Sequence, residues 1–139
     1  MYLLLDIGGT KMRVAISTDG QTFAPPKVFP TPESADEAVA LLRQTVSEKP
    51  AAVGVGITRR RQDIAVRLPD LFDCPVYLEN DAALAGLAEA TVGAGRGAKI
   101  VVYLTVSTGV GGARIVDGRI DANALGFEPG HQIIDEAQG

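Results

Sequence analysis

The chain has 139 residues, 46% of them hydrophobic and 22% charged, which allows one domain, or one domain plus an appendage, with a sizeable core. A formal net charge of −4 gives no general attraction to nucleic acid or to an anionic membrane, so we expect neither as a partner. One cysteine, Cys74, and one histidine, His131, exclude an internal disulfide and a Cys/His zinc knuckle. The apolar run before Asp6 is too short for a secretory leader, and the predicted location is the cytoplasm.

The first elements predicted along the chain are two strands and a helix. Tyr2–Leu5 and Met12–Ile16 are short runs of residues that favour strands, and the adjacent glycines between them indicate a tight turn. After a proline-rich passage, Ser34 and Glu37 have the spacing of a capping box, which predicts the start of a helix. We expect Pro50 to end that helix.

The middle of the chain predicts two buried strands and a second helix. Ala51–Ile57 is short, apolar and rich in valine, as expected for a strand covered on both faces. The arginines at 59–61 indicate a solvated loop, and Gln62–Leu68 is patterned as a short amphipathic strand. Pro75–Leu78 predicts the second buried strand, and Ala82–Val92 predicts the helix that follows it.

Beyond a glycine-rich hinge, the chain begins a second set of strands. Lys99–Val106 is the strongest strand pattern in the sequence, and a glycine-rich turn joins it to Ala113–Val116. An Asp-Gly pair then indicates a tight hairpin. Both halves thus open with strand, glycine-rich turn and strand, which is a weak internal repeat.

Two glycine-rich turns have backbone N–H groups that an anion could approach closely. The first, DIGGTK at Asp6–Lys11, lacks the spacing of a Walker loop or a dinucleotide fingerprint, and an ordinary glycine hairpin is the alternative. The second, STGVGG at Ser107–Gly112, ends the strongest strand. Together they could clamp a polyphosphate from two sides, because phosphoryl transfer depends on positioning and charge neutralisation.

A few polar residues are candidates for chemistry or for purely structural roles. Asn80 and Asp81 follow a buried strand and begin a helix, where one of them could cap the helix or Asp81 could act as a general base toward an alcohol. Glu128 and His131 form a polar cluster after a loop, although a lone histidine is more often a surface or packed residue. For the arginines at 59–61, a solvated face is favoured over a phosphate site.

Five blocks follow one another along the chain: DIGGTK, LEND with AALAGLAEA, VGAGRG, STGVGG and GFEPGH. In this order, from Asp6 to His131, they resemble the ROK family of repressors and sugar kinases, and in particular its glucokinase-like members. The resemblance implies an α/β fold, the RNase H-like lobe of the actin-like ATPase fold, with a mixed sheet and flanking helices. It implies two domains: residues 1–95 form the first lobe, and residues 96–139 form an incomplete start of a second lobe. It also implies a cleft where ATP, magnesium and a hexose meet.

The resemblance implies roles for individual residues. Asp81 resembles the base that deprotonates the sugar hydroxyl, and Asp6 resembles the carboxylate that holds Mg²⁺ through water. Asn80, Glu128 and His131 resemble residues that contact the sugar. The residues that resemble the family's phosphate loops are Gly8, Gly9, Thr10, Lys11, Thr108, Gly109 and Gly111.

The chain also departs from the family pattern. Thr58 and three arginines stand where the family usually has a Gly-x-Pro-Gly-Pro loop, so a sugar-facing loop is altered, and Arg67 replaces a typical Asn. In the family the histidine is also a zinc ligand, backed by downstream cysteines. This sequence stops at Gly139, about where those cysteines begin, and we therefore expect no zinc.

Two classes of function remain open from the sequence. One is an ATP-dependent hexose kinase relative of half length that needs a partner chain to complete its cleft, and the other is a non-catalytic scaffold or sugar- or phosphate-binding domain that keeps the family fold. A repressor is disfavoured, because repressors of the family carry a helix-turn-helix ahead of the first block and five residues precede Asp6. The strands of Lys99–Ile120 are expected to leave an apolar face and a free edge, which predicts a two-fold homodimer.

Overall fold

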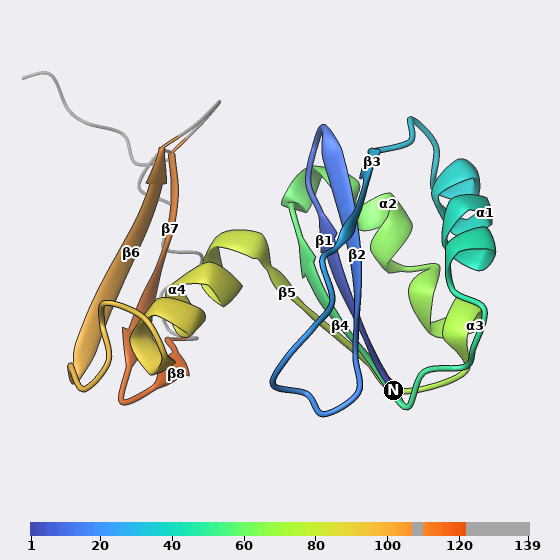
Figure 1. Ribbon diagram of the computed structural model, residues 1–139. Coiled ribbons are helices and arrows are strands. Elements are labelled where there is room, and N and C mark those ends of the chain that lie inside the picture. Colours follow the sequence, from blue (N-terminus) through green and yellow to red (C-terminus); the bar gives the residue numbers. More distant parts are fainter. Residues whose placement is uncertain (107–109, 122–139) are drawn as a thin grey trace, which may run out of the picture. The chain divides into compact units, whose positions relative to one another are not determined.

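The computed structural model describes residues 1–106 and 110–121 (Figure 1). The chain divides into two compact units, Met1–Asp81 and Ala82–Gly139. This division falls ahead of the helix that we expected to close the first domain, and the predicted boundary after residue 95 stays a prediction. Within the described residues, no helix is long and apolar enough to cross a membrane.

The first unit is built on a mixed sheet of five strands in the order β3-β2-β1-β4-β5. Its strands are β1 (Tyr2–Ile7), β2 (Lys11–Ser17), β3 (Lys27–Pro30), β4 (Ala52–Ile57) and β5 (Val76–Asn80). β1 pairs with β2 in the antiparallel sense and with β4 in the parallel sense, and β5 continues the parallel half. The pairing of β1 with β2 and the buried strand β4 confirm the prediction, whereas β3 was not predicted because its proline-rich surroundings hide an edge strand. The strand predicted at Pro75–Leu78 is present as β5, but its predicted burial is wrong, because β5 lies at the edge of the sheet and exposes Tyr77 and Leu78.

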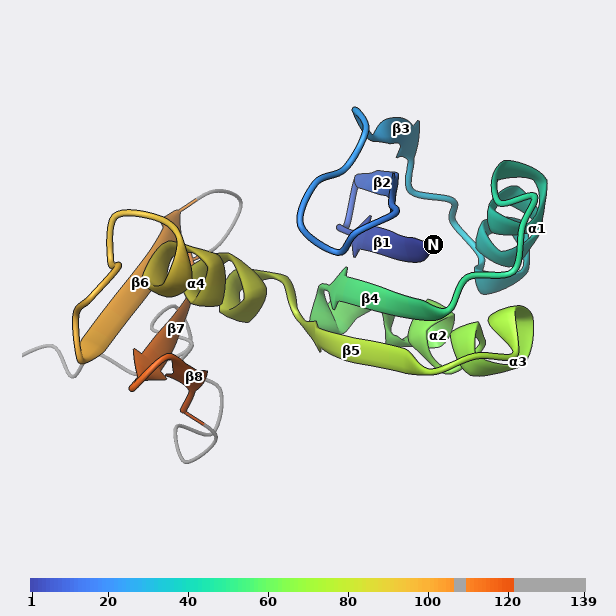
Figure 2. The ribbon, with the colours of Figure 1, turned by 60° about the horizontal axis from the view of Figure 1, so that its bottom comes forward.

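Every second residue of the central strands enters one core. On β1 the buried side chains are Leu3, Leu5 and Ile7, as the two-residue repeat of a strand requires. The helices α1 (Ala35–Thr45), α2 (Gln62–Ala65) and α3 (Leu68–Phe72) bury their apolar side chains in the same cluster. Figures 1 and 2 show these helices together on one side of the sheet, so the alternate residues of β1, including Asp6, face the other side.

The predicted start of α1 is confirmed by its hydrogen bonds. The Glu37 backbone N–H donates to the Ser34 hydroxyl over 3.2 Å, and the Ser34 backbone N–H donates to the Glu37 carboxylate over 3.4 Å. Both halves of the capping box are therefore present, and the helix start is fixed at Ser34.

The strand predicted for Gln62–Leu68 is wrong. A 3₁₀ turn, η1 (Arg59–Arg61), leads directly into α2, and α3 begins at Leu68 with Pro69 in its first turn. The buried residues Ile64, Ala65 and Leu68 lie at helical spacing. A window of seven residues is too short to distinguish this spacing from the alternation of a strand. Proline suits the first turn of a helix because the N–H that it lacks has no partner there.

The second unit combines one helix with an antiparallel sheet. Its elements are α4 (Asp81–Thr91), which begins at the last residue of the first unit, and the strands β6 (Ile100–Val106), β7 (Val110–Val116) and β8 (Arg119–Ile120). The strand order is β6-β7-β8. The predicted Asp-Gly hairpin is confirmed, with both turn residues at positive φ.

Helix α4 packs closely on this sheet through small residues. Ala83 and Ala90 form a cluster with Ala113 and Ile115 of β7. A Cβ atom added to Gly86 would lie 2.9 Å from the Cβ of Tyr103, which leaves no room for a side chain at this position. The glycine therefore permits the close approach of the helix to β6.

Candidate active site

Polar residues gather at the carboxyl edge of the first sheet. β1, β4 and β5 are parallel neighbours, so their carboxyl ends meet at the same edge. In the register of these strands Ile7 is level with Ile57, and Ile57 is level with Asn80. Two strand spacings, about 10 Å, therefore separate the end of β1 from the end of β5. The structure thus brings the DIGGTK turn and the Asn80–Asp81 pair to one edge of the sheet.

The glycine turn between β1 and β2 is closed by a backbone hydrogen bond at Gly8 and leaves open space at Gly9. The Gly8 N–H donates to the Lys11 carbonyl over 3.0 Å, and a Cβ at Gly8 would lie 3.1 Å from that oxygen. At Gly9, by contrast, an added Cβ would meet nothing within 4 Å. Thr10 and Lys11 are exposed. An anion can therefore approach the backbone of this turn, and Lys11 supplies a positive charge beside it.

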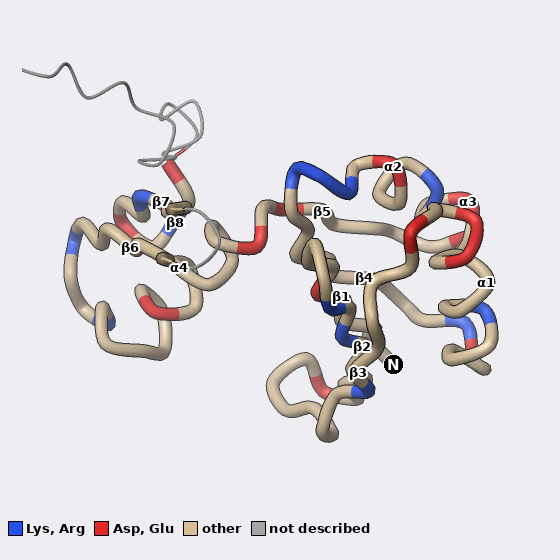
Figure 3. The backbone as a smooth tube through the Cα atoms, turned by 90° about the horizontal axis from the view of Figure 1, so that it is seen from above, with Lys and Arg blue, Asp and Glu red and all other residues tan. Residues whose placement is uncertain are grey.

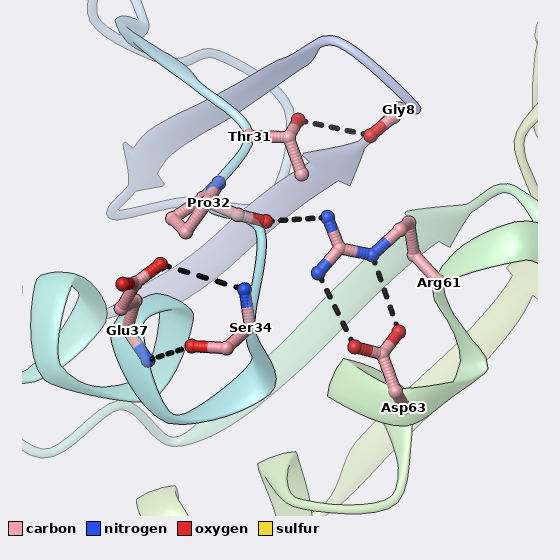
Figure 4. Close-up of polar contacts among 7 residues, drawn as sticks. All are labelled: Gly8, Thr31, Pro32, Ser34, Glu37, Arg61 and Asp63. Atoms are coloured by element: carbon pink, nitrogen blue, oxygen red, sulfur yellow. Dashed lines mark hydrogen bonds and ion pairs between the residues drawn. The ribbon is translucent and has the colours of Figure 1, made fainter.

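Two contacts hold the turn from outside. Thr31 donates its backbone N–H to the Thr10 carbonyl over 3.0 Å and its hydroxyl to the Gly8 carbonyl over 2.9 Å (Figure 4). Both carbonyl oxygens are thereby engaged by Thr31. The carbonyls of Gly8 and Thr10 are therefore held in place by the β3–α1 connection.

Asp6 forms an ion pair that the sequence analysis missed. Its carboxylate accepts from the Arg13 guanidinium over 2.5 Å, and the two side chains are 43% and 47% exposed. The residues are directly opposite each other in the β1–β2 register, which counting back from the glycine turn would have revealed. Carboxylate oxygen is a ligand that Mg²⁺ prefers, and a half-exposed carboxylate can hold the ion through water, so the donor fits this metal.

Asn80 and Asp81 lie where β5 gives way to α4. The Asn80 backbone N–H donates to the Glu79 carboxylate over 2.7 Å, and Asp81 is the first residue of the helix. Both side chains are half-buried. A carboxylate at the start of a helix interacts favourably with the helix dipole, and a carboxylate side chain can serve as a general base.

The arginine run is not simply a solvated face. Figure 3 shows it as a continuous blue segment before α2, and Arg59 and Arg60 are exposed. The Arg61 side chain, however, is 11% exposed and donates to the Pro32 carbonyl over 2.6 Å and to both Asp63 oxygens over 3.2 Å. These hydrogen bonds hold the pKa of Asp63 below its usual range. No pattern in the sequence pointed to this residue, because its carbonyl partner is 29 residues away.

The second glycine turn and the polar cluster are only partly covered by the structure. Thr108, Gly109, Glu128 and His131 lie outside the described residues. Gly111 belongs to β7 rather than to a turn, and a Cβ there would lie 3.2 Å from the Thr105 methyl group. Across residues 1–106 and 110–121, no group of three or more His, Cys, Asp and Glu side chains could hold a metal ion.

Comparison with known proteins gives a consistent family and fold. The model of the ROK family matches residues 55–138. N-acetylmannosamine kinase from Citrobacter koseri is 32% identical over an alignment that covers 96% of this chain and 54% of that protein. ROK hexokinase from Thermus thermophilus superposes with a TM-score of 0.71 at 35% identity, covering 96% of this chain and 52% of the other.

A third similarity is to the inorganic polyphosphate/ATP-glucomannokinase from Arthrobacter sp., with a TM-score of 0.72 at 34% identity. It covers 97% of this chain and 65% of that one. The chain thus spans about half the length of the first curated relative, the N-acetylmannosamine kinase. The predicted fold class is confirmed: an α/β lobe with a mixed sheet, of the actin-like ATPase fold found in the sugar kinases.

Proposed function

The chain belongs to the ROK family, and from this premise we propose that it forms part of an ATP-dependent sugar kinase. The observation that carries the proposal is the carboxyl edge of the first sheet, where Asp6 lies near the end of β1, the glycine turn follows that strand, and Asp81 follows β5. This edge offers a place for phosphate and a base for a hydroxyl. Relatives that phosphorylate a hexose or an N-acetylated amino sugar support the substrate class.

In the proposed reaction Asp81 is the general base. Its carboxylate accepts the proton of a sugar hydroxyl while the hydroxyl oxygen attacks the γ-phosphorus of ATP. The new bond joins the sugar oxygen to phosphorus, and the bond from phosphorus to the bridging oxygen of ADP breaks. Asn80, next to the base, binds neighbouring hydroxyls, and Glu128 and His131 are proposed as further sugar contacts.

The phosphates of the donor are assigned to the glycine turns. Gly8, Gly9, Thr10 and Lys11 form the first, and Lys11 offsets phosphate charge. The residues proposed for the second are Thr108, Gly109 and Gly111. When bound, Mg²⁺ would neutralise charge on the transferred phosphoryl group, and Asp6 is the residue proposed to hold it through water.

The test of the proposal is phosphoryl transfer by the purified chain. Incubation with ATP and Mg²⁺ and a panel of glucose, mannose, fructose and N-acetylmannosamine is expected to give sugar-dependent release of ADP. A partner chain is proposed to complete the cleft, so the assay is run across protein concentration. Binding of sugar or ATP by calorimetry without any turnover would instead support the alternative, a non-catalytic sugar- or phosphate-binding domain.

We propose that the partner chain is a second copy, packed in a two-fold homodimer. One face of β6 exposes four uncharged apolar residues in alternation, and Val110 of β7 continues it. An apolar patch of this kind rarely stays bare on a monomer, and two-fold dimers are the commonest closed assembly. The residues on the exposed face of β6 are Ile100, Val102, Leu104 and Val106.

The expected mass in light scattering at micromolar concentration is that of a dimer. Leu104→Lys places a charge in the centre of the apolar face and should give a monomer, because burying an unpaired ammonium is costly. Arg96→Ala, on an exposed position of the same unit, serves as the control and should stay dimeric. A wild-type monomer at this concentration contradicts the dimer.

We also expect the chain to bind no structural zinc and to work in the cytoplasm. Structural zinc needs about four ligands, chiefly cysteine and histidine, and the chain has one residue of each kind. Cys74 is a free thiol, which suits the reducing conditions of the cytoplasm. Elemental analysis of protein purified without an affinity tag is the measurement, and near-stoichiometric zinc would refute the expectation.

A further inference from the structure

Two loops of the candidate site are hydrogen bonded to the same short connection. Figure 4 shows the β3–α1 connection (Thr31–Ser34) with hydrogen bonds to both loops. On one side Thr31 binds the carbonyls of Gly8 and Thr10 in the glycine turn. On the other side the Pro32 carbonyl accepts from Arg61, in the loop that follows β4. The glycine turn and the arginine loop therefore share one support.

Arg61 is the anchor on the second side. Its guanidinium uses Nη1 for the Pro32 carbonyl and Nε and Nη2 for Asp63, a fork geometry that only arginine provides. The backbone closes the same loop, because the Arg61 N–H donates to the Thr58 carbonyl over 3.0 Å and the Thr58 N–H donates to the Ile7 carbonyl over 3.1 Å. The loop is thus joined both to β1 and to the β3–α1 connection.

The β3–α1 connection is itself fixed at both ends. Before it, Pro30 of β3 is paired with Lys11 of β2, next to the glycine turn. After it, the Ser34–Glu37 capping box fixes the first turn of α1. A segment fixed in this way transmits a displacement rather than absorbing it. Loss of the hydrogen bond from Arg61 to the Pro32 carbonyl should therefore also displace the glycine turn.

We propose that Arg61 is a positioning residue of this site: through Pro32 and Thr31 it holds the glycine turn in the conformation that presents its backbone N–H groups to phosphate. Arg61 touches no reacting atom in this role. The inference rests on the proposed function only for the identity of the ligands, since the hydrogen bonds themselves belong to the first unit.

Hydrogen–deuterium exchange of the first unit tests the anchor without any need for turnover. In Arg61→Ala we expect the amides of residues 8–11 and of Thr31, Glu33 and Ser34 to exchange about ten- to a hundredfold faster, the effect of losing hydrogen bonds from a charged group. Arg61→Lys keeps the positive charge but loses the planar guanidinium with its several donors, so its exchange rates should lie between those of the wild type and of Arg61→Ala. Arg60→Ala, an exposed neighbour in the same run, should exchange like the wild type.

Two further variants separate an anchor from general loss of stability. Thr31→Val removes the hydroxyl that binds Gly8 and should accelerate the same amides, with an effect that is not additive with Arg61→Ala because both act through one connection. Leu42→Ala destabilises the core without touching the connection. Wild-type exchange at residues 8–11 in Arg61→Ala and Arg61→Lys, or equal acceleration there in Leu42→Ala, would overturn the proposal.

Kinetics of the active protein give the second readout. Arg61→Ala should raise the KM for ATP and lower kcat/KM by up to about a hundredfold, as expected for misplacement of a site by a distant change, whereas Arg60→Ala should change neither. If the wild type is inactive, the proposed kinase activity is refuted, and the exchange experiment still tests whether Arg61 holds the glycine turn. An active wild type with unchanged exchange and KM in Arg61→Ala would refute the anchor alone.

Discussion

Asp81→Asn is expected to lower sugar phosphorylation by about a hundredfold to ten-thousandfold, the usual cost of losing a general base. The amide has nearly the shape of the carboxylate and tolerates the start of a helix, but it cannot accept a proton. Asp81 is the first residue of α4 and lies at the carboxyl edge of the sheet, so the change is confined to the candidate site. Initial rates of ADP release at saturating sugar and ATP are the measurement.

Asp70→Asn is the matched control for this substitution. Asp70 is exposed in α3 and the chemical change is the same, so activity should stay at the wild-type level. Circular dichroism of both variants should match that of the wild type. Turnover by Asp81→Asn at the wild-type rate, with matching spectra, would rule out Asp81 as the base.

Leu42→Ala should reduce the free energy of unfolding of the first unit by about 2 to 5 kcal/mol. Leu42 is 0% exposed and lies in the cluster formed by α1 and the central strands, so its removal leaves a cavity. Urea denaturation followed by circular dichroism measures the change, which should appear as a lower midpoint with an unaltered slope. Arg43→Ala, one residue further along the helix and exposed, should change the free energy by less than about 0.5 kcal/mol. A loss below about 1 kcal/mol in Leu42→Ala would contradict the burial of this side chain.

The local parts of the fold were predictable because short-range patterns determine them. The capping box at Ser34 and the hairpin between β7 and β8 each depend on a few neighbouring residues, and both are found where predicted. The segment Gln62–Leu68 was assigned wrongly because a short apolar window fits both periods. β3 was missed because its pairing with β2 is a tertiary contact of a proline-rich stretch.

The sequence named candidate residues for the site but not the contacts between them. The order of the sequence blocks indicated the glycine turn and the Asn80–Asp81 pair, and the parallel register places both at one edge. The bond from Arg61 to Pro32 joins residues far apart in the chain, and no local pattern encodes it. The ion pair of Asp6 with Arg13 is intermediate, since the hairpin register alone would have predicted it.

The pairing of β1 also determines the order in which the first sheet can assemble as the chain leaves the ribosome. β2 follows β1 at once, but β4, the other neighbour of β1, is complete only at Ile57, 40 residues after Ser17. At a synthesis rate of about 5 to 20 residues per second, the second edge of β1 waits about 2 to 8 s for its partner. The glycine turn is therefore formed within a hairpin before the opposite side of the site exists, and during those seconds the open edge of β1 is where a chaperone or a misplaced strand can bind.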